Sequence, residues 1–197
     1  MGDSYAKYET RQRNPEPHDA VLLVIDMQLY FQGMATPIIP AIRRTIECCR
    51  AQNIPVVYTR HCHKDPSDYG MLQEWFNEII HDGTPEAEIM SEVDKKANDK
   101  VIDKRTYSAF HNTDLEKYLR DQGKSEVIVT GVTTNVCCET TARDAFLRGF
   151  RVFFSTDATA SSNKDLHDSA LKNLAFGFAY LFDCQRLEDA FAAKVSA

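Results

Sequence analysis

Short runs of apolar and β-branched residues alternate along the chain with longer stretches in which apolar residues recur at helical spacing. Such runs are typical of strands buried in a parallel sheet, and the longer stretches are typical of amphipathic helices. The runs predict strands over 20–25, 54–58, 101–103, 126–130, 150–155 and 180–182. The helical spacing predicts helices over 37–52, 113–122, 138–149, 165–178 and 187–195. Strands and helices in this order predict an α/β protein, a three-layer α/β/α, Rossmann-like sandwich around a parallel sheet.

The chain divides into a polar N-terminal arm, residues 1–18, and a single domain, residues 19–197. Prolines end any regular structure in the arm, whose Tyr5 and Tyr8 we expect to dock on the domain or on a neighbouring subunit. A length of 197 residues with 43% hydrophobic content fits one domain with a sizeable core.

The most informative stretch is TGVTTNVCC, which overlaps the end of the strand at 126–130. Gly131 is expected to stop that strand, and short polar side chains then start a helix with Cys137 in its first turn. Unpaired backbone N–H groups and the positive end of the helix dipole favour a thiolate there, and the same N–H groups can stabilise an oxyanion. Strand, tight turn and cysteine together form a nucleophile elbow. A cysteine that only fills space in the core is the alternative interpretation.

Two other predicted strands carry reactive side chains at their carboxyl ends. Asp26 follows the strand at 20–25, and Lys104 follows the strand at 101–103. Because ligands bind beyond the carboxyl ends of strands in an open parallel sheet, we expect both side chains to meet Cys137 at one edge. The carboxylate can take the proton of the thiol, while the lysine keeps that carboxylate ionised and adds positive potential beside a thiolate.

Three separated stretches, AVLLVIDMQ, KRTYSAF and TGVTTNVCC, occur in an order that resembles the isochorismatase-like cysteine hydrolases. That family includes isochorismatases, nicotinamidases and carbamoyl-amide hydrolases, and the resemblance extends from about Ala20 to Cys184. Within the family, CCETTARDAF and FRVFFSTDATA look similar to plant-type nicotinamidases.

The resemblance implies a catalytic triad at the three positions already singled out. Asp26 would be the general acid and base, Lys104 its partner and Cys137 the nucleophile. The resemblance also implies a cis peptide bond between Val132 and Thr133, with an oxyanion hole formed by the backbone N–H groups of Thr133 and Cys137.

Cys138 competes with Cys137 for the role of nucleophile. Neighbouring helical residues point about 100° apart, so only one of the two can face the site, and the family's spacing from Gly131 selects Cys137. Farther along the same predicted helix, Arg143 and Asp144 are interpreted as an internal ion pair or as an anchor of the helix to the sheet.

Aromatic and histidine side chains near the strand ends are candidates for the wall of a substrate pocket. Trp75 belongs to YGMLQEWF, which resembles the isochorismatase branch of the family, and packing in the core is the alternative for it. The candidates are Tyr30, Phe31, His61, His63, Trp75 and Tyr107.

His61 and His63 raise the question of a metal. Metal-dependent nicotinamidases carry an Asp-x-His pair at this place, and here His61 stands where the aspartate would be. Histidines two apart on an extended segment point the same way and can share an ion, but two ligands without a third make a weak site. We therefore expect no cofactor, and an anchoring or substrate-contacting role for the pair.

The composition is acidic and includes no long apolar run. A net charge of −6 offers no basic field to nucleic acid or to an anionic membrane, and no run approaches the roughly 20 residues of a membrane helix. The first residues lack the apolar core of a secretory signal, so we expect a cytoplasmic protein, with signal-independent secretion left open. The six cysteines are interpreted as free thiols in a reducing compartment.

Three hypotheses of function follow, each with a small molecule as ligand. The first, favoured by Cys137, is hydrolysis of nicotinamide to nicotinate and ammonia through a cysteine thioester. The second is cleavage of isochorismate to pyruvate and a dihydroxybenzoate-type diol, with Asp26 as general acid; the resemblance implies glycine at position 137 for many such enzymes. The third is a catalytically silent member that binds a metabolite, against which the complete triad argues.

Members of the family are commonly dimers or larger assemblies, so we expect a homo-oligomer. Aromatic residues near the C-terminal end of the chain are candidates for its interface or for the core. They are Phe176, Phe178, Tyr180 and Phe182.

Overall fold

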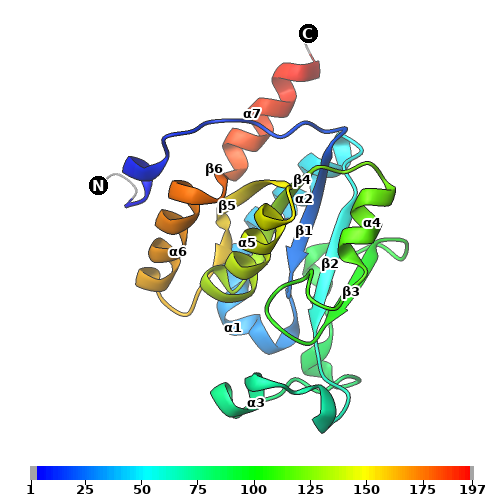
Figure 1. The fold of residues 1–197 in the computed structure, drawn as a ribbon. Coiled ribbons are helices and arrows are strands. Elements are labelled where there is room, and N and C mark those ends of the chain that lie inside the picture. The colour runs from blue at the N-terminus through cyan, green and yellow to red at the C-terminus, as the bar shows by residue number, and fades with distance from the viewer. Residues whose placement is uncertain (1–3, 196–197) are drawn as a thin grey trace.

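Six strands form one parallel sheet in the structure, a computed structural model that describes residues 4–195 (Figure 1). The strands are β1 Ala20–Ile25, β2 Val56–His61, β3 Lys100–Lys104, β4 Glu126–Val132, β5 Arg151–Ala160 and β6 Tyr180–Phe182. Their order across the sheet is β3-β2-β1-β4-β5-β6, and every pairing is parallel. The predicted parallel α/β sheet is confirmed.

Helices connect the strands and cover both faces of the sheet. The α-helices are α1 Gln32–Ala35, α2 Ile39–Ala51, α3 Met71–Phe76, α4 Leu115–Asp121, α5 Glu139–Leu147, α6 Lys164–Gly177 and α7 Cys184–Val195. Single 3₁₀ turns lie at Ala6–Tyr8, Leu29–Phe31, Thr36–Ile38, Pro66–Asp68, Pro85–Ala87 and Ser91–Val93. Between residues 4 and 195, no helix has the length and apolar character needed to span a membrane.

The side chains of β1 show why the sheet needs helices on both sides. Val21 and Leu23 point into the core cluster that α4, α5 and α6 complete, whereas Leu22 and Val24 point into the cluster that α2 and α7 complete. All six residues of this strand are fully buried. Successive side chains of a strand face opposite ways, so an uninterrupted apolar strand requires a hydrophobic layer on each face.

Gly131 does not stop β4, contrary to the prediction from the sequence. The strand continues to Val132, and Gly131, at φ 110°, lies where the pairing of β4 with β5 shifts its register. A Cβ atom at this position would lie 2.0 Å from the backbone oxygen of Ile25 in β1. The glycine is therefore required by the close approach of two strands.

Alanine at position 131 should prevent stable folding. The clash adds to the about 1–2 kcal/mol that a positive φ costs an L-residue, because the backbone of Ile25 cannot yield without opening the sheet. The matched control is Gly149→Ala, where φ is 82° but nothing lies within 4 Å of the added carbon. Thermal unfolding of both variants compares the effects. A melting temperature of Gly131→Ala close to that of Gly149→Ala would contradict the steric argument.

The N-terminal arm crosses the sheet ends and is tied to the body (Figure 1). Glu126, fully buried at the start of β4, accepts a hydrogen bond from the backbone nitrogen of Glu16 at 2.7 Å and pairs with Arg151 at 2.8 Å. Tyr5 and Tyr8 pack against the core cluster that α4, α5 and α6 complete. Of the two docking sites expected for these tyrosines, the structure shows the body of the same chain.

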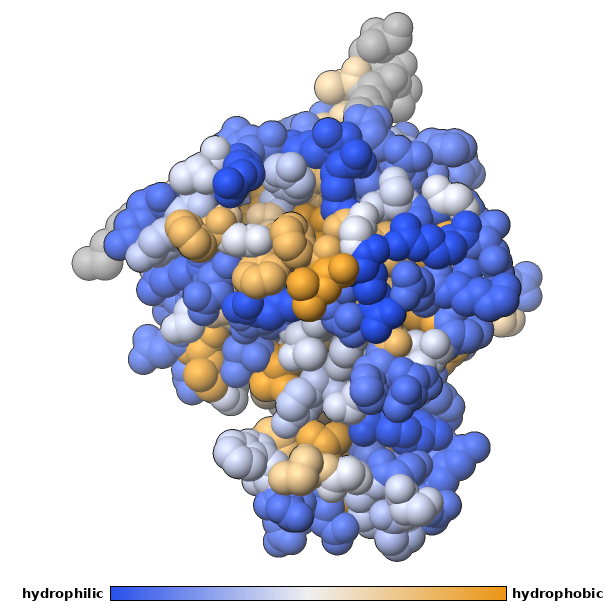
Figure 2. Space-filling model, viewed as in Figure 1, coloured by the Kyte–Doolittle hydropathy of each residue, from blue (hydrophilic) through white to orange (hydrophobic). Residues whose placement is uncertain are grey.

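The aromatic residues proposed for a subunit interface have different environments. Phe182 is buried in the core, whereas Phe176 at the end of α6 is 70% exposed. Phe146 and Leu147, at the end of α5, are also exposed. Apolar side chains gather on the face of the molecule that Figure 2 shows. The homo-oligomer stays a prediction, with Phe176 and not Phe182 available for it.

Candidate active site

Three of the six strands deliver one reactive side chain each to the same edge of the sheet. Asp26 directly follows β1, Lys104 is the last residue of β3, and Cys137 lies in a π-helical turn, Thr134–Cys138, that follows β4. Asp26 and Lys104 are buried, and Cys137 is 7% exposed. The structure thus brings together the three residues that the sequence singled out.

The three side chains contact one another directly. Lys104 Nζ lies 2.7 Å from Asp26 Oδ2 and 3.5 Å from Cys137 Sγ, and it donates to the Thr106 carbonyl oxygen at 2.9 Å. The other carboxylate oxygen of Asp26 accepts a hydrogen bond from Thr59 Oγ1 at 2.5 Å. Buried charges persist only when they are paired and hydrogen-bonded, and both conditions are met here.

The charges of the site set the protonation of the lysine and the cysteine. Burial by itself lowers the pKa of Lys104, but the charge of Asp26 and the hydrogen bonds to Asp26 and Cys137 outweigh it and raise that pKa above its usual value. Burial raises the pKa of Cys137 to about 12, against the opposing effect of Lys104. The resting residue is therefore a thiol and not the thiolate expected from its place at a helix start, because desolvation exceeds the effect of the neighbouring cation. The thiol hydrogen-bonds to Asp26, the group that can take its proton.

The raised pKa of Cys137 predicts slow alkylation in the absence of substrate. The thiolate is the reactive form, so below a pKa of about 12 the rate with iodoacetamide should rise about tenfold per pH unit. An ordinary thiol, with a pKa near 8.5, should instead level off above about pH 9. Mass spectrometry of the peptide that contains Cys137, between about pH 7 and pH 10, measures the rate. A plateau near neutral pH would show a resting thiolate.

A cavity of about 460 Å³ opens over Cys137. Five of the six candidate pocket residues line it, and His63 does not. Glu78 is the single charged side chain of the lining in the part of the chain that the structure describes, and its carboxylate accepts a hydrogen bond from Tyr30. The lining residues are Tyr30, Phe31, Met34, His61, Leu72, Trp75, Phe76, Glu78, Ile80, Tyr107, Thr133, Asn135, Val136, Cys137, Ser162 and Leu166.

Trp75 and Phe76 belong to a small lobe that carries α3 and lies apart from the sheet (Figure 1). Trp75 is 75% exposed, which excludes core packing as its role. The ring of Phe76 meets that of Tyr107 edge to face at 6.5 Å. Apolar side chains are visible where the lobe meets the body (Figure 2). The lobe therefore contributes aromatic rings to the lining of the cavity, which the turn that carries Cys137 also lines.

His63 is fully buried behind His61 and does not reach the cavity, which corrects its assignment to the pocket wall. Its Nε2 lies 3.2 Å from Nε2 of His61, and its Nδ1 faces the carbonyl oxygen of Asp68 at 2.9 Å and a carboxylate oxygen of the same residue at 3.1 Å. Burial and, next, the charge of Lys104 lower the pKa of His61 to about 3, so its ring is neutral.

The donor set at this place does not fit a resident metal ion. The two imidazoles are hydrogen-bonded to each other, and His63 uses its second nitrogen on Asp68. No group of three His, Cys, Asp or Glu side chains that could hold an ion occurs among residues 4–195. Structural metal sites use four protein ligands and catalytic zinc sites three. Instead, His61 lines the cavity, and His63 behind it connects His61 to Asp68.

The cis peptide bond between Val132 and Thr133 that the resemblance implied is present. The carbonyl oxygen of Thr133 accepts from the backbone nitrogens of Val136 at 3.2 Å and of Cys138 at 3.1 Å, which closes the π-helical turn. Thr133 lines the cavity beside Cys137. The oxyanion hole from the N–H groups of Thr133 and Cys137 stays a prediction, in a location where substrate can reach both residues.

Thr59 is a site residue that sequence reasoning missed. Its hydroxyl oxygen accepts from the backbone nitrogen of Asp26 at 3.0 Å, and the hydroxyl donates to the carboxylate of the same residue. It is fully buried on β2, next to β1 in the sheet. A threonine inside an apolar strand carries no sequence signal for this role, because β-branched residues are common in strands.

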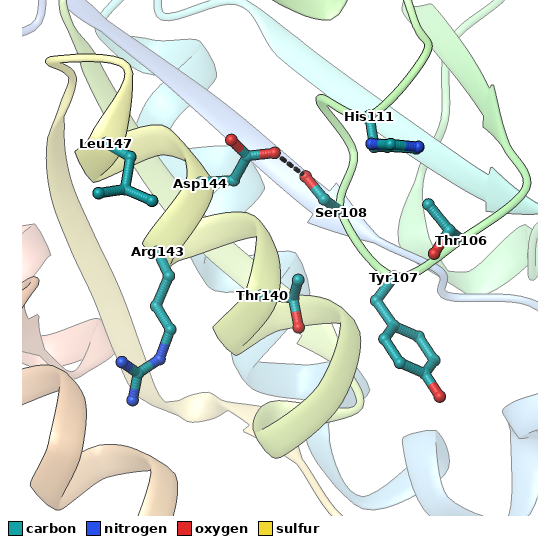
Figure 3. Close-up of a pocket in the computed structure, with 8 residues that line it drawn as sticks. All are labelled: Thr106, Tyr107, Ser108, His111, Thr140, Arg143, Asp144 and Leu147. Atoms are coloured by element: carbon teal, nitrogen blue, oxygen red, sulfur yellow. Dashed lines mark hydrogen bonds between the residues drawn. The ribbon is translucent and has the colours of Figure 1, made fainter. Parts of the chain in front are cut away.

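Arg143 and Asp144 do not pair with each other, so the interpretation as an ion pair was wrong. Arg143 binds Glu139, whereas Asp144 accepts from Ser108 Oγ at 2.6 Å and from Arg148 Nε at 2.7 Å. Figure 3 shows the contact between Asp144 on α5 and Ser108 in the loop after β3. Asp144 thus anchors α5, the helix that directly follows the turn with Cys137, to the loop that follows Lys104.

A parallel α/β sandwich that gathers an aspartate, a lysine and a cysteine at one sheet edge defines the class of the protein as a cysteine hydrolase. More particularly, the chain belongs to the Isochorismatase family, whose domain matches residues 20–186. The resemblance inferred from the sequence motifs is confirmed.

The chain is similar to characterised and solved members of this family. It is 55% identical to Nicotinamidase 3 of Arabidopsis thaliana, over 93% of this chain and 94% of that protein. It is 33% identical to the Isochorismatase of Bacillus subtilis (strain 168), over 82% of this chain and 54% of that longer protein. The crystal structure of a cysteine hydrolase from Pseudomonas syringae pv. phaseolicola 1448A superposes with a TM-score of 0.88 at 27% identity, covering 92% of this chain and 96% of that one.

Proposed function

We propose that the chain hydrolyses the carboxamide of a small neutral aromatic molecule, nicotinamide, to nicotinate and ammonia. The observation that carries the proposal is the cavity, which is walled by aromatic and apolar side chains and reaches Cys137. Aromatic rings bind a flat ring by stacked and edge contacts. The high identity to Nicotinamidase 3 supports the same substrate.

The geometry supports a covalent mechanism. Sγ of Cys137 attacks the carboxamide carbon while its proton passes to Asp26, and the N–H groups of Thr133 and Cys137 receive the developing oxyanion. The tetrahedral intermediate collapses as Asp26 returns that proton to the departing nitrogen, so that ammonia leaves and a thioester remains. Asp26 then takes a proton from water, whose oxygen attacks the thioester. As the carbon–sulfur bond breaks, Asp26 gives that proton to the departing sulfur, so that the carboxylic acid is released and the thiol is restored.

Lys104 contributes charge and not a proton in this mechanism. Its ammonium stays 2.7 Å from the Asp26 carboxylate and 3.5 Å from the sulfur. It therefore faces the thiolate that exists briefly during attack, and it balances the negative charge that moves between sulfur and carboxylate.

Cleavage of isochorismate is the second candidate, and the relative from Bacillus subtilis is the observation in its favour. Isochorismate is a dianion with two carboxylates. The described lining of the cavity includes no Lys or Arg side chain, and its one charged group, Glu78, is negative. An unpaired buried charge is costly, so a cavity of this kind favours the neutral amide.

Separate incubations with nicotinamide and with isochorismate, with ammonia and pyruvate measured, test the proposal. Ammonia release in the first, at a kcat/KM far above that of pyruvate release in the second, is the expected result. Pyruvate as the main product, lost in Asp26→Ala but kept in Cys137→Ala, would replace the proposal by ether cleavage. The absence of both products would reject both substrates.

A further inference from the structure

The turn that carries Cys137 is held from the side by α6 and the loop before it. Thr134 Oγ1, at the first residue of the turn, lies 2.9 Å from Nδ1 of His167 on α6. The next residue, Asn135, accepts a hydrogen bond from Ser161 in the loop between β5 and α6. These two contacts bridge segments about 30 residues apart in the sequence.

The direction of the hydrogen bond between Thr134 and His167 follows from the surroundings of the ring. Burial lowers the pKa of His167, so the ring is neutral and carries one proton. The ring also hydrogen-bonds to the backbone of Thr156, whose carbonyl oxygen can only accept. That carbonyl takes the single proton of the ring, which leaves Nδ1 to accept from the hydroxyl of Thr134.

Neither Thr134 nor His167 touches the cavity, so neither can contact substrate. Their neighbours in the chain do: Asn135, Val136 and Cys137 line one wall, and Ser162 and Leu166 line another. Thr134 is fully buried. The hydrogen bond therefore fixes two walls of the cavity relative to each other, one of which presents the thiol.

We propose that His167 is a positioning residue for Cys137. It accepts a hydrogen bond from the hydroxyl of Thr134 and thereby fixes the turn that presents the thiol and its neighbouring N–H groups. The inference rests on Cys137 being the nucleophile of the proposed reaction. A nucleophile displaced by about 1 Å loses on the order of 100-fold in rate even when substrate still binds. The role predicts a loss in kcat with KM retained.

Two variants remove the hydrogen bond from either side. Thr134→Val keeps the shape of the side chain and removes the donor, and His167→Phe keeps a ring and removes the acceptor. Each should lower kcat for nicotinamide about 10- to 100-fold with KM changed less than about threefold. The double variant should lose no more activity than the less active single variant, because both substitutions remove the same hydrogen bond. His167→Asn, whose amide oxygen can replace Nδ1 as acceptor, should recover part of the activity.

Leu171→Ala provides the matched control. Leu171 is a buried core residue on the same helix, 1% exposed, and it does not line the cavity. Its truncation should lower the melting temperature while kcat stays near the wild-type value. A fall in kcat that follows melting temperature across all the variants would overturn the positioning role, and so would a rise in KM at unchanged kcat or multiplicative losses in the double variant.

Hydrogen exchange tests the positioning role independently of the proposed function, because it does not depend on enzymatic activity. Backbone amides in 133–138 should exchange at least about tenfold faster in Thr134→Val and His167→Phe than in the wild type. In Leu171→Ala, the amides of 133–138 should exchange at the wild-type rate once the contribution of global unfolding has been subtracted. If the wild type releases no ammonia from nicotinamide, the proposed function fails, and unchanged exchange at 133–138 would reject the positioning role independently.

Discussion

Alanine at position 137 should abolish amide hydrolysis, with a loss of at least about 10⁴-fold in kcat/KM. No other cysteine lines the cavity, and Cys137 is the one within 3.5 Å of Lys104 Nζ among the described residues. Without the sulfur no thioester can form, and a water molecule in its place lacks a thiolate's nucleophilicity. Ammonia release from nicotinamide measures the loss, and retained circular dichroism and melting temperature show that the fold is intact.

Cys138→Ala is the matched control for this experiment. The neighbouring thiol is fully buried and points back to the sheet, where its Sγ lies 3.8 Å from the Thr130 carbonyl oxygen. Burial raises the pKa of Cys138 well above its usual value. We expect activity within a few-fold of the wild type, together with a small loss of stability. Activity lost in this variant and kept in Cys137→Ala would reverse the assignment of the nucleophile.

The sequence was sufficient to predict the triad because each member is tied to a strand end. A run of buried residues defines each strand, and the carboxyl ends of parallel strands meet at one edge. Asp26, Lys104 and Cys137 therefore converge whatever the details of the loops between them. The same logic failed for Gly131, because its role depends on the backbone of Ile25 in a strand more than 100 residues earlier.

The protonation of the site lay beyond the sequence for a related reason. A cysteine in the first turn of a helix indicates a thiolate when that turn is solvated. Here the turn is π-helical and Cys137 is only 7% exposed, so the cost of desolvating a charge dominates. The contacts of Thr59, His63 and His167 likewise arise between separate elements, and buried polar residues give no periodic signal that would reveal them.

The lysine explains how a buried thiol can still react. The pair of Asp26 and Lys104 carries no net charge, so a proton that moves from sulfur to carboxylate leaves a thiolate beside an ammonium. The transfer replaces the carboxylate–ammonium pair by a thiolate–ammonium pair, so the net charge of the site does not change and no ion from solvent is needed. A site so arranged can hold its nucleophile neutral until a substrate occupies the oxyanion hole, which limits side reactions of the sulfur.

Lys104→Met should therefore destabilise the fold as well as abolish activity. The variant leaves the carboxylate of Asp26 buried, hydrogen-bonded to Thr59 but without its counter-ion. Removing one partner of a buried ion pair costs about 3–5 kcal/mol. Urea unfolding measures the free energy of unfolding, and ammonia release measures activity. Lys117→Met, which breaks an exposed pair with Asp121, should leave both unchanged.

The double variant Asp26→Asn with Lys104→Met separates the two effects of the pair. It removes both charges, so much of the stability lost in Lys104→Met should return. Activity should not return, because an asparagine can neither take the proton of Cys137 nor give one to ammonia. Stability that stays as low as in the single variant would show that packing around Lys104, and not its charge, holds this edge of the sheet together. Activity in the double variant would remove Asp26 from the proton path.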